Sequence, residues 1–278
     1  MHPTRTDLTS KFSLIDDPLL SSLKSRWFSE SQREISFREF LPLANEWFQS
    51  TKNNQISGWS EFPCHDVTMG CTHYIESLIG KYGWDGFQIL KNEYAYYTLM
   101  GKHGVAVDDL KPNKPLLITI PHWTWCDIRP EWNDILTIAK ERNIDIHIDM
   151  AWMLTARDIE IDLSHPCIKS FAMSMSKLKL EWSRVGVRWS RQRSMDSVTI
   201  FNEYYKITNT IMTSVGGFFM ENIERDHLWN RYKSAHHDLC NQLNISPTKI
   251  VHIAKDNDTG ESLGIGRFLG IPTPNCVQ

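Results

Sequence analysis

The stretch Ser-Met-Ser-Lys at 174–177, followed by Arg-Val-Gly at 184–186, says most about the fold and the chemistry of this chain. It comes directly after an apolar run at 168–173, which is typical of a buried strand. A lysine in this position can form a Schiff base with the carbonyl group of a ligand. Hydroxyl groups and an arginine beside it can donate hydrogen bonds to an anion. We therefore predict that this stretch holds a ligand covalently and binds its anionic group.

Apolar runs of strand length alternate with stretches of helical period from about residue 66 onward. The predicted strands cover 87–90, 115–120, 144–148, 168–173 and 185–189, and the predicted helices between them cover 75–82 and 132–142. This alternation predicts an α/β fold in three layers with a mostly parallel sheet. Because ligands bind beyond the carboxyl ends of parallel strands, we expect Asp149, Lys177 and the segment 121–123 to share one site.

The chain divides by pattern into three parts. Residues 1–55 are predicted to form an N-terminal arm with a helix at 37–47, and residues 56–205 the large domain. Residues 206–278 are predicted to form a small α+β domain. Its expected elements are helical stretches at 204–212 and 227–243, followed by extended segments at 249–253 and 263–271.

Composition and charge exclude several classes of protein. A net charge of −3 provides no basic field for nucleic acid. No apolar run is long enough to span a bilayer, and the first residues lack the apolar core of a signal peptide. The six cysteines are scattered without a C-x-x-C pair, which favours reduced thiols. We therefore expect a cytoplasmic protein without a membrane or nucleic-acid partner.

Over residues 66–190 these motifs resemble the fold-type I pyridoxal-phosphate (PLP) enzymes, the aspartate-aminotransferase-like family. The resemblance implies PLP as the cofactor and Lys177 as the residue that forms its Schiff base. It implies that Arg184 binds the phosphate, with Ser174 and Ser176 beside it. Asp149, in Asp-Met-Ala-Trp at 149–152, resembles the carboxylate that faces the pyridinium nitrogen. Lys177 and Asp149 are thus the expected catalytic residues.

Three further segments carry a weaker resemblance to the same family. Thr-Met-Gly-Cys-Thr at 68–72 resembles the phosphate-binding turn at the start of a helix, where backbone N–H groups favour an anion. Tyr94 resembles the tyrosine that stacks on the cofactor ring, and Arg267 the arginine that binds the substrate carboxylate. The residues implied in the phosphate turn are Gly70, Cys71 and Thr72.

The sequence departs from the family pattern at two cofactor positions. Trp152 stands where the family has a tyrosine, and the segment 121–125, with Trp123, stands where it has an asparagine–proline pair. The resemblance implies that both tryptophans contact the cofactor and that Trp123 also contacts the substrate. The spacing from Lys177 to Arg184 is one residue shorter than is common in the family.

The function expected from this resemblance is a PLP-dependent enzyme that acts on an amino acid or primary amine, most often an aminotransferase. A lyase, decarboxylase or oxidase would use the same lysine, and a non-catalytic PLP-fold binding or assembly subunit is a second hypothesis. The family's active sites lie at a dimer interface, which implies a homodimer.

A third hypothesis comes from different chemistry. His147, Asp149 and His252 could form a two-histidine, one-carboxylate iron site, with Arg267 binding an oxo acid. The alternation of strands and helices is against this hypothesis, because such an iron site requires a double-stranded β-helix, which has many strands and few helices. His236, His237 and Cys240 have helical spacing for a metal but lie on a polar helix, so no metal is predicted.

Overall fold

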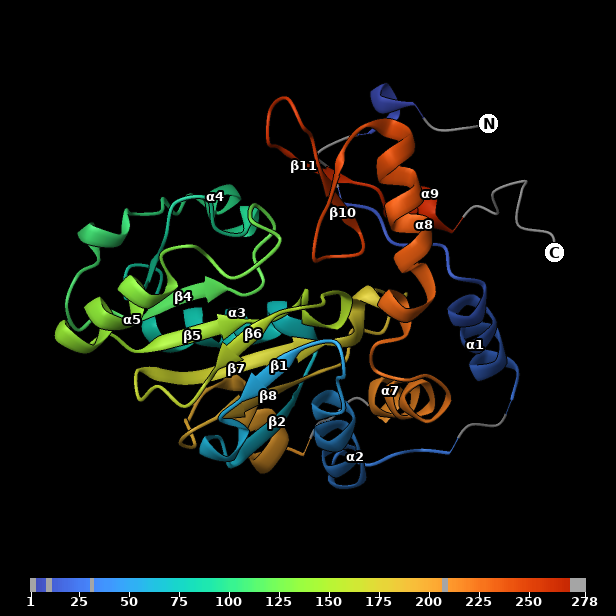
Figure 1. Cartoon of the computed structure of the whole chain (residues 1–278). Coiled ribbons are helices and arrows are strands. Elements are labelled where there is room, and N and C mark those ends of the chain that lie inside the picture. The colour runs from blue at the N-terminus through green and yellow to red at the C-terminus, as the bar shows by residue number, and fades with distance from the viewer. Residues whose placement is uncertain (1–3, 9–11, 31–32, 207–209, 271–278) are drawn as a thin grey trace.

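The computed structural model describes residues 4–8, 12–30, 33–206 and 210–270. Within these residues, six strands form a central sheet in the order β2-β8-β7-β5-β4-β3 (Figure 1). Strands β3, β4, β5 and β7 pair in parallel, whereas β8 is antiparallel to both of its neighbours. The predicted α/β fold with a mostly parallel sheet is therefore confirmed. The strands are β2 (Cys64–Thr68), β3 (Gln88–Ile89), β4 (Leu116–Thr119), β5 (Ile146–Asp149), β7 (Ile168–Ser174) and β8 (Gly186–Ser190).

The sheet is buried on both faces, which explains why its strands are apolar runs rather than alternating ones. Helix α3 (Gly70–Tyr82) covers one face, where Leu117 of β4 belongs to its apolar cluster. The next residue, Ile118, belongs to the larger cluster on the other face, together with Ile135 of helix α5 (Trp132–Glu141). The predicted helices at 75–82 and 132–142 thus correspond to α3 and α5, which form the two outer layers.

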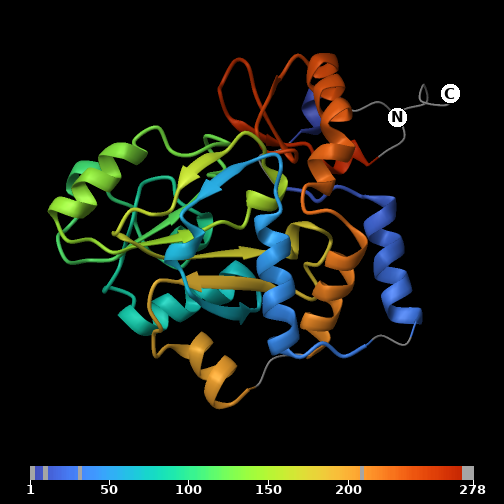
Figure 2. The ribbon, with the colours of Figure 1, turned by 60° about the horizontal axis from the view of Figure 1, so that its bottom comes forward.

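Three helices from distant parts of the chain lie side by side, and one of them, α2, packs next to strands β2 and β8 (Figure 2). They are α1 (Pro18–Ser29), α2 (Phe37–Gln49) and α7 (Thr210–Asn222). Helix α7 approaches α2 closely because of its glycines, since a Cβ on Gly216 would lie 2.9 Å from both Phe40 Cε2 and Val185 Cγ1. The largest apolar cluster includes residues from all three predicted segments, among them Phe40, Phe171 and Val251. The division into domains stays a prediction.

The C-terminal part contains helix α8 and a small antiparallel sheet of order β11-β10-β9 (Figure 1). The prediction of an extended segment at 263–271 was wrong in part. The chain leaves the strand at Gly264 and forms helix α9, where Gly266 lets the Ser13 carbonyl approach, and 271 lies outside the described residues. The elements are α8 (His227–Leu243), β9 (Ser246–Pro247), β10 (Ile253–Lys255), β11 (Ser262–Gly264) and α9 (Gly266–Leu269).

Two other boundaries differ from the prediction. The extended segment expected at 249–253 becomes a strand only from Ile253, because Thr248 and Trp229 bind carbonyl groups of the preceding turn. The helix expected at 204–212 is divided between a π-helical turn (Ile200–Tyr204) and α7, and residues 207–209 lie outside the described residues.

The remaining elements are short. Strands β1 and β6 form a separate parallel pair, and no helix in the described part of the chain is both long and apolar enough to cross a membrane. The short elements are β1 (Gln55–Ser57), β6 (Glu160–Asp162), α4 (Ala95–Leu99), α6 (Ser197–Thr199) and 3₁₀ turns at Arg5–Asp7, Trp59–Glu61, Val107–Asp109, Met153–Thr155 and Met175–Lys177.

Candidate active site

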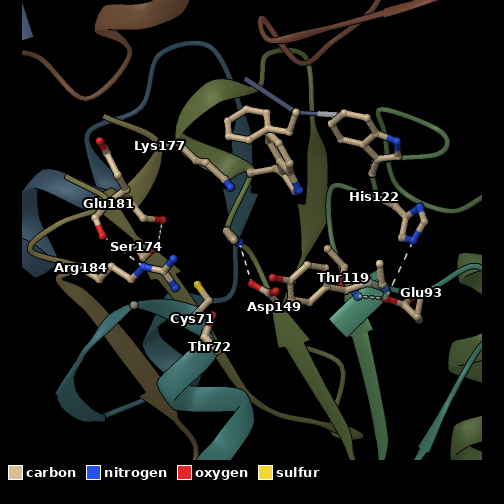
Figure 3. Close-up of a pocket in the computed structure, with 18 of the residues that line it drawn as sticks. Cys71, Thr72, Glu93, Thr119, His122, Asp149, Ser174, Lys177, Glu181 and Arg184 are labelled. Carbon is tan, nitrogen blue, oxygen red and sulfur yellow. Dashed lines mark hydrogen bonds and ion pairs between the residues drawn. The ribbon is translucent and has the colours of Figure 1, made fainter. Parts of the chain in front are cut away.

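A cavity of about 550 Å³ lies beyond the carboxyl ends of β4, β5 and β7 (Figure 3). Thr119, Asp149 and Ser174, the last residues of these three strands, all line it. The expectation that strand ends share one site therefore agrees with the geometry. The predicted site residues that line this cavity are Gly70, Cys71, Thr72, Tyr94, Trp123, Asp149, Trp152, Ser174, Ser176, Lys177 and Arg184.

Lys177 lies in the 3₁₀ turn that follows β7, and its amine points into the cavity (Figure 3). Lys177 Nζ is 4.3 Å from the ring centroids of both Phe12 and Trp152. Burial lowers the pKa of Lys177, and the nearby Asp149 carboxylate partly opposes this shift. An amine with a lowered pKa has a larger neutral fraction, and the neutral amine is the form that attacks a carbonyl group.

Asp149 ends strand β5 at the floor of the cavity, where its Oδ1 accepts a hydrogen bond from the Ala151 N–H at 2.9 Å. Burial raises the pKa of Asp149, while the Ala151 N–H, the Cys71 thiol and the Lys177 charge lower it. The Cys71 thiol donates to the Ala172 carbonyl at 3.4 Å, and burial raises its pKa well above the usual value. Cys71 is therefore a packed thiol, and Asp149 is the carboxyl group that can face a cationic N–H group of a ligand.

Groups that could bind an anion lie on one side of Asp149, at the N-terminus of α3 (Figure 3). Met69, the N-cap residue, makes no side-chain cap hydrogen bond to the described residues of this helix, so the N–H groups of its first turn and the helix dipole are directed at the cavity. Gly70 has φ +76°, and a Cβ on it would lie 3.4 Å from Arg184 Cβ. The Ser174 and Ser176 hydroxyl oxygens are 2.8 Å apart on the same wall.

The Arg184 side chain completes this set of groups. Its Nε donates to the Glu181 carbonyl at 3.3 Å, and no acidic side chain pairs with this guanidinium among the residues that the structure describes. The remaining donors of the guanidinium fork are thus available for an oxyanion.

Aromatic side chains form the opposite wall of the cavity. The ring centroids of Trp123 and Trp152 are 5.5 Å apart. Tyr94 begins helix α4 and is 45% exposed, with its ring stacked 5.9 Å from that of Tyr96. A planar ligand above Asp149 would therefore meet rings contributed by three separate loops.

Arg267 does not line the cavity. Its guanidinium contacts the Asp7 carbonyl and lies over the Phe268 ring at 4.6 Å. Its backbone N–H donates to Ser13 Oγ at 2.9 Å. The assignment of Arg267 to a substrate carboxylate stays a prediction.

Several further cavity residues were not predicted from the sequence, among them Phe12, Leu14, Glu93 and Thr119. Phe12 and Leu14 come from the N-terminal segment, and no local pattern links them to a site in the sheet. Glu93 follows strand β3 and Thr119 ends strand β4, so their position at strand ends was the signal that could have identified them. His122 also lines the cavity, and it belongs to the segment 121–123 that was expected there.

The geometry does not support the iron-site hypothesis. His147 Nδ1 is 2.7 Å from Ser170 Oγ, and its Nε2 is 2.9 Å from the Tyr82 hydroxyl, so both ring nitrogens are engaged. Across the described ranges, no three His, Cys, Asp or Glu side chains are grouped so that they could hold a metal ion.

No family model matches this sequence, and no curated protein matches it. Solved structures do match the fold. An aromatic aminotransferase from Pyrococcus horikoshii superposes with a TM-score of 0.60 and 13% identity, over 89% of this chain and 79% of the other. An aspartate aminotransferase from Thermotoga maritima superposes with a TM-score of 0.58 and 15% identity, over 88% of this chain and 76% of the other. A PLP-bound C-S lyase from Staphylococcus hominis superposes with a TM-score of 0.57 and 12% identity, over 91% of this chain and 76% of the other.

These neighbours define the class of fold. The chain has the fold of the fold-type I PLP-dependent enzymes, as the sequence motifs predicted. Because the neighbours include both aminotransferases and a lyase, the comparison identifies the fold and does not identify a particular reaction.

Proposed function

We propose that this chain is a PLP-dependent enzyme that acts on an amino acid or another primary amine through a Schiff base at Lys177. The observation that carries the proposal is the placement of the partly buried Lys177 amine and the buried Asp149 carboxyl group on one cavity. PLP requires an amine, a carboxylate and an anion site, and the anion site is the uncapped start of α3 beside Arg184.

The residues present fit this cofactor. Gly70 leaves space beside Arg184 that any larger residue would fill, and the first turn of α3 has no side-chain cap to compete with a phosphate. The Arg184 guanidinium, the paired serine hydroxyls and the helix N-terminus would hold the phosphate group. Asp149 would face the ring nitrogen, and Tyr94, Trp123 and Trp152 would contact the ring.

The chemistry of the reaction is divided between the cofactor and the protein. Bound PLP would supply a ring that takes up the electrons released at the carbon next to the amine. Asp149, as a carboxylate, favours a proton on the ring nitrogen. Lys177 would hold the aldehyde group, and its free amine could move a proton as base and then as acid. Phe12 and Trp152 lie over the Lys177 amine and cover part of it.

Aminotransfer is the reaction that we propose first, because it is the most frequent outcome in enzymes that this chain resembles. A lyase is the second candidate, because the solved structures that match the fold include a C-S lyase. Arg267 lies outside the cavity, so the cations that line the cavity within the described residues are Lys177 and Arg184. Both have other roles, which leaves a substrate carboxylate without a dedicated cation in this conformation.

We also propose that the chain acts as a homodimer. Large apolar side chains are exposed next to the cavity, on and beside helix α4: Leu99 is 85% exposed and Met100 is 56% exposed. Met69, at the start of α3, is 48% exposed. Burial of these side chains against a second copy would remove apolar area from water. Light scattering on wild type and Leu99→Glu tests this, and a monomeric wild type would contradict it.

Borohydride reduction of the PLP-loaded protein tests the proposed anchor. Mass mapping of the reduced protein should find the cofactor on the peptide that contains Lys177. Lys177→Ala should lose this label, whereas Lys169→Ala, at the other edge of the sheet, should keep it. Protein that stays unlabelled, or a label on another lysine, would overturn the proposal.

Turnover separates the candidate reactions. If the chain is an aminotransferase, the PLP-loaded enzyme should consume amino acids from a pool only when a 2-oxo acid is present. Consumption without a 2-oxo acid, together with release of a leaving group, would assign a lyase. A labelled protein without turnover would leave the binding subunit as the function.

A further inference from the structure

Two polar side chains form the end of the cavity that is remote from Arg184. Along the edge of the sheet, the end of β7 carries Ser174, the end of β5 Asp149 and the end of β4 Thr119, and Glu93 follows β3. Adjacent strands are about 4.8 Å apart. Glu93 and Thr119 therefore lie on the side of Asp149 opposite to the anion-binding residues, as Figure 3 also shows.

This end of the cavity contains buried polar atoms that have no hydrogen-bond partner among the described residues. The Glu93 side chain is 0% exposed, and its Oε2 accepts from the Thr119 N–H at 3.2 Å and the Tyr94 N–H at 3.4 Å. Its Oε1 has no hydrogen-bond partner among the described residues, and neither has Thr119 Oγ1. The Thr119 hydroxyl is near enough to lower the pKa of Glu93 but does not reach hydrogen-bonding geometry. Buried polar atoms are rarely left unpaired, so a ligand group is expected to meet them.

The charges around Glu93 keep its carboxyl group able to ionise. Arg129 Nη1 is 3.7 Å from Oε1, and His122 Nε2 is 3.9 Å from Oε2. Burial raises the pKa of Glu93 to about 7, and the Arg129 charge limits this rise. Burial lowers the pKa of His122 to about 3, so His122 is neutral and Arg129 is the cation that faces Glu93. Near neutral pH, Glu93 can accept a hydrogen bond as a carboxylate.

We propose that Glu93 and Thr119 form a subsite for a hydroxyl group of the bound ligand. The hydroxyl group donates to Glu93 Oε1 and accepts from Thr119 Oγ1. A hydroxyl group fits both atoms, whereas an ammonium group only donates and a carboxylate only accepts. The ligand hydroxyl belongs either to the cofactor ring or to the side chain of an amino-acid substrate. This inference rests on the proposed function and adds a specificity site to it.

Thr119→Val is the sharpest test, because valine keeps the shape of threonine and Thr119 Oγ1 has no partner in the described structure to lose. Glu93→Gln is the second variant, and it replaces one carboxylate oxygen with an NH₂ group, which is a hydrogen-bond donor of similar size. Thr137→Val, on the exposed face of α5, is the matched control. The dissociation constants of PLP and of its 3-deoxy analogue are measured from quenching of tryptophan fluorescence.

Each arm of the experiment has its own outcome. If the subsite binds the ring hydroxyl, Thr119→Val and Glu93→Gln weaken PLP binding about tenfold or more, and the 3-deoxy analogue abolishes this difference. If it binds a substrate hydroxyl, PLP affinity is unchanged. The KM for serine or tyrosine then rises about tenfold or more relative to alanine or phenylalanine. Unchanged PLP affinity with unchanged substrate preference would overturn the subsite while leaving the proposed function intact. A wild type that does not bind PLP would overturn both.

Discussion

Gly70 and Arg184 approach each other so closely that a methyl group on Gly70 would lie 3.4 Å from Arg184 Cβ. Gly70 also has φ +76°, a conformation that residues with a side chain rarely adopt. This contact brings the first turn of α3, the Arg184 guanidinium and the end of β7 together around one small volume. Glycine at this position is thus part of the proposed phosphate site and not only a helix start.

We expect Gly70→Ala to weaken PLP binding by about tenfold or more, because alanine is strained at φ +76° and relief of this strain would rotate the first turn of the helix, which forms the proposed phosphate site. Gly83→Ala is the matched control. It ends the same helix with φ +74°, and its Cβ would meet no atom within 4 Å. Both variants should lose roughly 1 kcal/mol of stability, but only Gly70→Ala should lose cofactor affinity in a fluorescence titration. Equal PLP affinity in the two variants would contradict the proposed phosphate site.

Asp149→Asn should separate cofactor binding from turnover. The amide keeps the shape of the carboxyl group but does not favour a proton on the ring nitrogen, so kcat should fall about a hundredfold or more. The dissociation constant of PLP should change much less, because the phosphate site is intact. Asp145→Asn, at the other end of β5 next to Lys169, should leave kcat unchanged. A normal kcat in Asp149→Asn would exclude this role of the carboxylate.

Acid should destabilise the protein through its buried histidines. Burial lowers the pKa of His252 to about 3, and its two ring nitrogens have no partner among the described residues. Below about pH 6.5 the unfolded chain therefore binds a proton on His252, whereas the folded chain does not. The resulting stability is fully present above that pH and is lost as the pH falls toward 3.

Urea unfolding at several pH values measures this effect. His252→Leu should reduce the slope of the unfolding free energy between pH 6 and 4 by up to about 1.4 kcal/mol per pH unit, which corresponds to one proton. The slope that remains in this variant would come from other buried histidines with lowered pKa values, such as His122, His147 and His236. A slope identical to that of the wild type would show that His252 is protonated in the folded protein.

Two glycine-to-alanine changes in helices should act in opposite directions. In Gly216→Ala the new Cβ would lie 2.9 Å from Phe40 Cε2 and Val185 Cγ1, so α7 must move away from α2 at a cost of roughly 1–3 kcal/mol. In Gly80→Ala, within α3, the new Cβ meets no atom within 4 Å. Here helix propensity should increase stability by up to about 1 kcal/mol. Thermal unfolding of both variants measures the difference, and a stabilised Gly216→Ala would contradict the close α2–α7 packing.

The sequence by itself determined the strands β3, β4, β5, β7 and β8 of the sheet, although it did not predict β2 (Cys64–Thr68), and it located the centre of the proposed site. Runs such as 144–148 and 168–173 are apolar throughout because both faces of their strands are covered, and this pattern is local. The residues that end such strands meet at one edge of a parallel sheet, so Asp149 and Lys177 could be grouped without a structure.

Tertiary structure alone decided which distant residues complete the cavity. Phe12 lies over the Lys177 amine, and Glu93 is buried beside Thr119. Arg267 turns toward Asp7 because helix α9 packs against the N-terminal segment. The physical reason is that periodicity reports how each segment is buried, whereas contacts between segments far apart in the chain depend on how the helices and loops pack together.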